Sequence, residues 1–246
     1  MKKKYKKWLL VSGILCLILV LGSFFYIKSS SYVASSAAQI TAKKAIREDN
    51  VLIFEGKKEN PAIIFYQGAL VENKSYSIWA YQVAEAGFSV YLIQSPFNLA
   101  VLDTKAAQEL IEKEQLSTVV LGGHSLGGVI ASRAAGELIQ ENKVKGVFFL
   151  ASYPDEKGSL QTFEGSVLSI TGDYDNVLNE KNYQESKQFL PQQTEYQTII
   201  GGNHAGFGSY GPQKGDGKSI ITNQQQQMEI SERLIQWLQT IEMKTP

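Results

Sequence analysis

Residues Thr118 to Gly128 read Thr-Val-Val-Leu-Gly-Gly-His-Ser-Leu-Gly-Gly. A short run of β-branched and apolar residues ends at Leu121, and a stretch with helical periodicity starts near Leu126. Between them, Gly123 to Gly127 fits the G-x-S-x-G pattern of a serine on a sharp turn from a strand into a helix. Glycines suit this turn because its backbone is strained and its neighbours approach closely. The stretch therefore predicts a strand, a reactive Ser125 and a helix in direct succession.

Outward from this stretch, the chain alternates two kinds of segment. Short apolar or β-branched runs are typical of strands buried on both faces, as in a parallel sheet. They are Val51–Phe54, Ala62–Tyr66, Phe88–Ile93, Thr118–Leu121, Val147–Leu150, Val167–Ile170 and Thr198–Ile200. Stretches with helical periodicity lie between and after them: Ser75–Ala86, Thr104–Lys113, Leu126–Gln140, Glu180–Leu190 and Gln224–Thr240. This order predicts a doubly wound α/β fold, a mostly parallel sheet with flanking helices.

Composition excludes several classes of protein. The chain has 246 residues, with 24 basic and 24 acidic side chains, and its length beyond residue 28 suits one domain. Six lysines lie in the first 28 positions, so the remainder is net negative and we expect no nucleic-acid partner. The single cysteine, Cys16, rules out a disulfide or a cysteine-ligated metal in the domain. Two histidines leave little for zinc, so we expect no metal. The chemistry of an activated serine needs no cofactor.

The amino terminus predicts a membrane segment. Five lysines precede Trp8–Ile27, a stretch of 20 residues without a charged side chain. A helix of that length spans the hydrocarbon core of a bilayer, about 30 Å thick. The lysines predict a cytoplasmic amino terminus and an extracytoplasmic domain. A cleaved signal peptide stays open as an alternative, because small residues such as Ser36 to Ala38 offer a cutting site.

These features divide the chain into three parts. Residues 1–28 are expected to form the basic segment and transmembrane anchor, or an uncleaved signal. Residues 29–45 begin with small and polar side chains and are expected to form a spacer. Residues 46–246 are expected to form the catalytic domain. The glutamine run Gln224–Gln227 follows Asn223, a plausible helix cap, and we expect it to form a solvated first helical turn.

A serine hydroxyl needs a general base to act as a nucleophile at neutral pH, and imidazole is the suitable side chain. The chain has two histidines, His124 and His204. His124 is the neighbour of Ser125 in the turn and cannot face it. Elimination therefore selects His204, which follows the strand-like run Thr198–Ile200.

From about Asn50 onward the chain resembles the α/β-hydrolase superfamily, and more narrowly the α/β-hydrolase fold-5 subfamily, relatives of the dienelactone hydrolases. The resemblance rests on Phe65–Val71 (FYQGALV), on the Gly123–Gly128 turn with Ala131 and Arg133, on Leu150–Pro154 (LASYP) and on Gly201–Gly217 (GGNHAGFGSYGPQKGDG). It implies an eight-stranded, mostly parallel sheet and a catalytic triad in the order Ser, Asp, His.

The acid of the triad has two candidates, Asp173 and Asp175, in the turn after Val167–Ile170. The family pattern at this turn resembles Gly-x-x-Asp and implies Asp175, which leaves Asp173 as a turn residue. Asp103 and Asp216 fit the chain order less well. The resemblance also implies that the backbone amides of Leu126 and Ala69 form an oxyanion hole. Gln67 stands where many relatives carry His or Pro, and its side-chain contacts are left open.

The resemblance and the spacing suggest what the site accepts. Only about 15 residues separate Leu150 from Ser166, too few for the helical cap of larger lipases. Little or no cap favours a small-molecule ester or an ester displayed on the cell envelope. We expect the segment Ala205–Lys218 to fold over the site as a rigid loop. Acyl transfer to an envelope component, or a binding role without catalysis, stay open as alternatives.

Overall fold

The computed structural model describes residues 29–242 and, before them, Trp8, Ser12, Leu15, Cys16 and Gly22. The chain from Tyr32 onward forms one compact unit. None of the helices within the described residues combines the length and the apolar character that a membrane crossing requires. The expected span Trp8–Ile27 lies almost entirely outside the described residues, so the membrane anchor stays a prediction.

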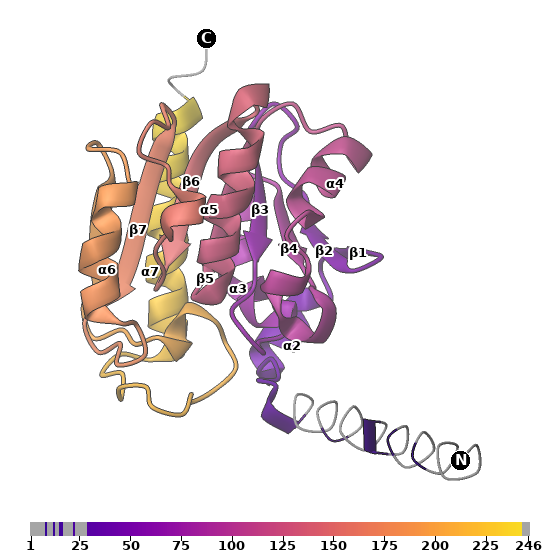
Figure 1. Cartoon of the computed structure of the whole chain (residues 1–246), viewed down its shortest axis with the longest axis vertical. Helices are drawn as coiled ribbons and strands as arrows, with labels where there is room; N and C mark the ends of the chain where they lie inside the picture. The colour runs from indigo at the N-terminus through magenta and orange to yellow at the C-terminus, as the bar shows by residue number, and fades with distance from the viewer. Residues whose placement is uncertain (1–7, 9–11, 13–14, 17–21, 23–28, 243–246) are drawn as a thin grey trace. The chain divides into compact units, whose positions relative to one another are not determined.

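An eight-stranded sheet runs through the unit that starts at Tyr32 (Figure 1). Its strands are β1 (Ile46–Glu48), β2 (Val51–Phe54), β3 (Ala62–Tyr66), β4 (Val90–Ile93), β5 (Val119–His124), β6 (Val144–Leu150), β7 (Ser166–Gly172) and β8 (Glu195–Ile199). Their spatial order is β1-β2-β4-β3-β5-β6-β7-β8. The pairs β1–β2 and β2–β4 are antiparallel, and all pairs from β4 to β8 are parallel. The expected mostly parallel sheet is confirmed.

Helices cover both faces of this sheet. They are α2 (Ser36–Ala42), α3 (Ser77–Glu85), α4 (Ala106–Lys113), α5 (Leu126–Leu138), α6 (Glu180–Ser186) and α7 (Asn223–Glu242). Strand β3 shows how the layers form, because its side chains alternate between two apolar cores. Ile63 and Phe65 pack with α3 and α7, while Ile64 and Tyr66 pack with α4 and α5. Figure 1 shows α4 and α5 on one side of the sheet and α3 and α7 on the other.

The parallel strands bring their carboxyl ends to one edge of the sheet, which we call the carboxyl edge. Strands β3, β5, β7 and β8 end there. The candidates Ala69, Ser125, Asp175 and His204 follow β3, β5, β7 and β8 in turn. In open α/β sheets this edge is where ligands bind, because the loops that leave it face one another.

The amino-terminal boundary of the folded unit differs from the expectation. Tyr32 pairs with Val71 in a parallel bridge, and α2 buries Ala38 and Ala42. Residues 32–45, expected to belong to a spacer, are therefore part of the folded unit. The physical reason is that alanines spaced four residues apart form a flat helical face that packs closely on another helix. Small residues are common in both linkers and such faces, so composition alone could not separate them.

Candidate active site

Ser125 sits on a strained turn between β5 and α5. Its backbone adopts φ 51° and ψ −124°, a conformation that residues other than glycine rarely take. Hydrogen bonds hold the turn: the Ser125 amide donates to the Leu150 carbonyl over 3.0 Å, and its carbonyl accepts from the Ser152 hydroxyl over 2.5 Å. The sequence prediction of strand, serine and helix is thus met, and Ser125 lies at the carboxyl edge.

His204 and Asp175 meet at the same edge. His204 follows β8, Asp175 follows β7, and the distance from His204 Nδ1 to Asp175 Oδ2 is 2.8 Å. The two side chains are only 2% and 1% exposed. The second carboxylate oxygen of Asp175 accepts from the amides of Val177 and Leu178, both over 2.8 Å. An ionised carboxylate only accepts, so Nδ1 carries the proton and Nε2 is the nitrogen that can take one up.

A pocket joins Ser125 and His204. It encloses about 240 Å³, and we call it the Ser125 pocket. Leu126 and Val129 of α5 form part of its wall, and Val177 and Leu178 form another part. The two residues whose amides hold Asp175 therefore also shape the space in front of Ser125. The structure brings Ser125 and His204 to one pocket at the carboxyl edge, and Asp175 contacts Nδ1 of that histidine.

The other aspartates that the sequence offered lie elsewhere. Asp173 Oδ1 accepts from the Gly201 amide over 2.6 Å and ties the turn after β7 to the turn after β8. This is the role of a turn residue. Asp103 lines a different pocket, described below. Asp216 does approach His204, but it binds the backbone of the histidine rather than its ring.

Asp216 holds the loop that carries His204. Its Oδ1 accepts from the His204 amide over 3.2 Å, and its Oδ2 accepts from the Ala205 amide over 2.8 Å. These bonds fold the segment after residue 204 back onto the histidine. Sequence reasoning considered Asp216 only as a candidate acid and missed this positioning role. Its place inside the glycine-rich block Gly201–Gly217 was the available signal.

Two buried glutamines hold the same loop from the opposite side. The Gln226 side chain accepts from the Asn203 amide over 3.1 Å and donates to the Asn203 carbonyl over 2.8 Å. The Gln227 side chain donates to the carbonyls of Gly206 and Gly208. Gly206 packs so closely on Gln226 that a Cβ there would collide with the amide. Gln226 and Gln227 are 1% and 0% exposed, so the expected solvated helical turn is wrong for this pair.

The expected cap of α7 is also corrected. Thr222 caps the helix instead of Asn223: its hydroxyl accepts from the Gln225 amide over 3.2 Å. The Gln225 side chain accepts in return from the Thr222 amide over 2.8 Å, which completes a capping box. Asn223 lies inside the helix, and its side chain donates to the Gly208 carbonyl. Within α7, Gln226 and Gln227 lie one turn before Ile230 and two turns before Leu234. All four side chains therefore lie on the buried face of the helix.

The loop after β3 carries the candidate oxyanion donor Ala69. It lies directly over the start of α5, since the carbonyls of Tyr66 and Gln67 approach Gly127 too closely for a Cβ to fit. Within the described part of the chain, the backbone amides of Ala69 and Leu126 donate no hydrogen bond to a backbone carbonyl. Gln67 is buried and its side chain accepts from the Ser95 amide, so it fixes the end of β4.

His124 ties this loop to the strand that carries Ser125. The Tyr76 hydroxyl accepts from the Gly68 amide over 2.9 Å and lies 3.0 Å from His124 Nδ1. The hydroxyl and Nδ1 share one hydrogen bond, and the tautomer of His124 decides which of the two atoms donates. Burial lowers the pKa of His124 well below its usual value, and the neighbouring His204 lowers it further. The two imidazole rings are 4.6 Å apart, and a neutral His124 adds no charge beside His204.

The segment between β6 and β7, where larger lipases have a helical cap, is short and held in place by an ion pair. Between β6 and β7 it contains one 3-10 turn, Glu156–Gly158. Arg133 of α5 forms an ion pair with Asp155, and its Nε donates to Asp155 Oδ1 over 3.1 Å. This contact lowers the pKa of Asp155 below its usual value. The expectation of little or no cap is met by these residues.

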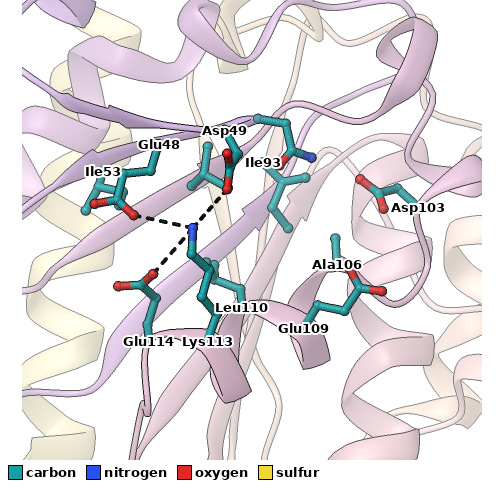
Figure 2. Close-up of a pocket in the computed structure, with 12 residues that line it drawn as sticks. Glu48, Asp49, Ile53, Ile93, Asp103, Ala106, Glu109, Leu110, Lys113 and Glu114 are labelled. Carbon is teal, nitrogen blue, oxygen red and sulfur yellow. Dashed lines mark hydrogen bonds and ion pairs between the residues drawn. The ribbon is translucent and has the colours of Figure 1, made fainter.

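A second pocket lies between α4 and the β1–β2 end of the sheet, and it encloses about 150 Å³ (Figure 2). We call it the Lys113 pocket. Its acidic lining residues are Glu48, Asp49, Asp103, Glu109 and Glu114. Figure 2 shows the Lys113 ammonium between Glu48, Asp49 and Glu114, at 3.4, 3.0 and 4.0 Å. Over the described residues, no cluster of His, Cys, Asp or Glu has the arrangement of a metal site.

Comparison with known proteins agrees with the fold. Residues 62–228 match the alpha/beta hydrolase family, and the chain belongs to that family. No curated protein matches it.

Solved structures share the fold at low sequence identity. A monoacylglycerol lipase from Paleococcus ferrophilus has a TM-score of 0.59 and 14% identity, over 79% of this chain and all of the other (100%). A putative lipase from Acinetobacter baumannii has a TM-score of 0.61 and 12% identity, over 85% of this chain and 95% of the other. A dienelactone hydrolase from Anabaena variabilis has a TM-score of 0.57 and 15% identity, over 80% of this chain and 96% of the other. At these identities the likeness establishes the fold.

Proposed function

We propose that this protein is a serine hydrolase that cleaves carboxylic esters through Ser125, His204 and Asp175. The observation that carries the proposal is the 2.8 Å contact between Asp175 Oδ2 and Nδ1 of His204, a histidine that lines the same pocket as Ser125. A buried carboxylate on Nδ1 fixes the tautomer of the imidazole and stabilises its protonated form. The family match and the lipases and dienelactone hydrolase among the similar folds support the same reaction class.

The reaction proceeds in two steps. Ser125 Oγ attacks the ester carbonyl while His204 Nε2 takes the hydroxyl proton, and the amides of Ala69 and Leu126 stabilise the oxyanion. Collapse of the tetrahedral intermediate breaks the C–O bond, and His204 returns the proton to the leaving alcohol. Water then attacks the acyl-enzyme with His204 again as base, which releases the acid and restores Ser125. These steps require no cofactor.

The pocket favours a compact acyl group. Leu126, Val129, Val177 and Leu178 give it apolar walls, and its volume of about 240 Å³ is small. We therefore propose a small-molecule or envelope-associated ester as substrate. Acyl transfer uses the same acyl-enzyme with an alcohol in place of water, and product analysis with and without added alcohol distinguishes the two reactions.

The proposed reaction is tested by covalent labelling. A fluorophosphonate should label the wild-type chain, and Ser125→Ala should abolish both labelling and ester hydrolysis. Ser117→Ala, an exposed serine just before β5, is the matched control and should change neither. A folded wild-type protein without labelling contradicts the proposal and favours a binding role. Labelling that persists in Ser125→Ala contradicts the assignment of Ser125 as the nucleophile.

We further propose that Trp8–Ile27 anchors the protein in the cell membrane, with the amino terminus in the cytoplasm and the catalytic domain outside. The five lysines before this apolar stretch support that orientation. Protease added to intact protoplasts should digest the domain. A domain that is protected until lysis contradicts the orientation, and a domain released with a new amino terminus near Ala38 supports the cleaved form.

A further inference from the structure

Residues 32–42 form a segment that contacts two loops of the candidate site, and we call it the strap. We infer that the strap positions the loop after β3, which carries Ala69, relative to the loop that carries His204. This inference rests on the proposed function, since it assigns a catalytic consequence to the contact. It treats the strap as a positioning element, because no strap residue lines the Ser125 pocket.

The strap binds the loop after β3 through its backbone. The Tyr32 amide donates to the Leu70 carbonyl over 2.7 Å, and the Glu72 amide donates to the Tyr32 carbonyl over 3.1 Å. The Ala34 amide also donates to Glu72 Oε2 over 3.2 Å. Leu70, the neighbour of Ala69, has φ 61° and needs outside contacts to hold that conformation. The strap supplies one of them directly beside the candidate oxyanion donor.

The same strap binds the His204 loop. The Ser35 amide donates to the Ser209 carbonyl over 2.7 Å, and the two hydroxyl oxygens of these serines are also 2.7 Å apart. The rings of Tyr32 and Tyr210 lie 5.3 Å apart. Ser209 follows the short 3-10 turn Ala205–Phe207 that starts directly after His204. One continuous segment of eleven residues thus bridges the two loops.

Helix α2 fixes the strap to the core. Ala38 is 0% exposed, and Ala42 packs into the apolar core that contains Trp79 and Val83 of α3. Ser35 caps the helix, since its hydroxyl accepts from the Ala38 amide over 3.2 Å. The strap is therefore a rigid bridge, and a displaced α2 would loosen the site at both of its loops.

The test compares two charge substitutions in α2 of the full-length chain. Ala38→Glu places a carboxylate at the buried face and should displace the helix. Ile40→Glu is the matched control, because Ile40 lies in the same helix and is 64% exposed. We expect kcat for ester hydrolysis to fall about tenfold or more in Ala38→Glu, with KM within about threefold, since displaced oxyanion donors mainly affect the transition state. Ile40→Glu should match the wild type in both constants.

Hydrogen exchange gives a readout that does not depend on activity. Amides in residues 68–72 and 204–211 should exchange faster in Ala38→Glu and at the wild-type rate in Ile40→Glu. If Ala38→Glu unfolds the protein, Ser35→Ala replaces it; this variant loses the hydroxyl contact to Ser209 and should show the same changes at smaller size. Unchanged exchange in both loops, or faster exchange with unchanged kcat, overturns the inference. A wild-type chain without Ser125-dependent turnover refutes the proposed function instead, and exchange still decides whether the strap holds the loops.

Discussion

The Ser125 pocket and the Lys113 pocket differ in how their charged groups are held. The Lys113 pocket is lined by five carboxylates and one ammonium, yet the Lys113 side chain is 50% exposed and that of Asp49 is 79% exposed. The Ser125 pocket has a single carboxylate behind its histidine, and both side chains are almost fully buried. Water screens the first set of charges and reaches the second very little. The His204–Asp175 pair is held in one orientation and shielded from water. The larger number of charges in the Lys113 pocket is therefore no guide to which pocket is the active site.

The two pockets also differ in the hydrogen bonds that hold their charged groups in place. Asp175 receives two backbone amides, and the His204 loop is held by Asp216, Gln226 and Gln227. Every one of these contacts either fixes a side chain of the candidate triad or fixes the backbone that carries it. The Lys113 ammonium instead has three carboxylate partners, and water competes with them because the Lys113 side chain is half exposed.

The largest expected effect tests the buried histidine, His204. His204→Ala should reduce kcat/KM for an ester by about 10⁴-fold or more, because Ser125 loses its general base. The thermal unfolding midpoint of the variant serves as the control for folding. A folded His204→Ala protein that retains more than a few per cent of the wild-type rate would contradict the proposed base.

The next effect separates the two aspartates after β7. Asp175→Asn should lower kcat by about 10³- to 10⁴-fold, because an amide cannot hold the imidazole in the required tautomer. Asp173→Asn should lower kcat less than about tenfold, since the Asp173 carboxylate bonds the Gly201 amide and does not contact His204. Steady-state kinetics of the two variants decide the assignment; equal losses, or the reverse order, would remove Asp175 from the proposed triad.

A smaller effect tests the support of the His204 loop. Gln226→Leu removes both bonds to Asn203 and leaves two backbone groups without partners, so we expect kcat to fall about 10- to 100-fold. Gln224→Leu is the matched control, because Gln224 is exposed on the same helical turn. Similar rates for the two variants in steady-state assays would show that the buried glutamine has no positioning role.

The smallest effect belongs to the Lys113 pocket. Lys113→Met should leave kcat and KM for ester hydrolysis within about twofold of the wild type, because its ion pairs are exposed and none of their members lines the Ser125 pocket. The measurement is the same ester assay, run beside Gln226→Leu. A loss as large as that of Gln226→Leu would remove the distinction between the two pockets.

The sequence predicted the centre of the sheet better than its margins. Strand β3 was predicted at its observed bounds, Ala62–Tyr66, because both faces are buried and every residue is apolar or aromatic. Strand β1, Ile46–Glu48, was missed because its three residues are exposed and two are charged. Helix α2 was missed because its small residues are as common in spacers as in packed helices.

The candidate site shows the same limit. Ser125, His204 and Asp175 were found because residue type, a motif and a family pattern all point to them. Gln226 and Gln227 were assigned to solvent, although the periodicity of Ile230 and Leu234, extended one turn back, reaches the buried face. Glutamine is rarely buried, and residue type outweighed periodicity in that prediction. The two amides are buried because backbone groups of the His204 loop satisfy them.

The contact between Ser35 and Ser209 has a consequence for how the protein is made. It joins residues 174 positions apart, so it can form only after most of the chain has been synthesised. Forming it requires ordering a very long intervening chain, and contacts of such separation are characteristic of slow folding. The two loops of the candidate site therefore reach their final relation late. A chain that is still being synthesised therefore contains Ser125 before the loop of His204 has reached its place beside the strap.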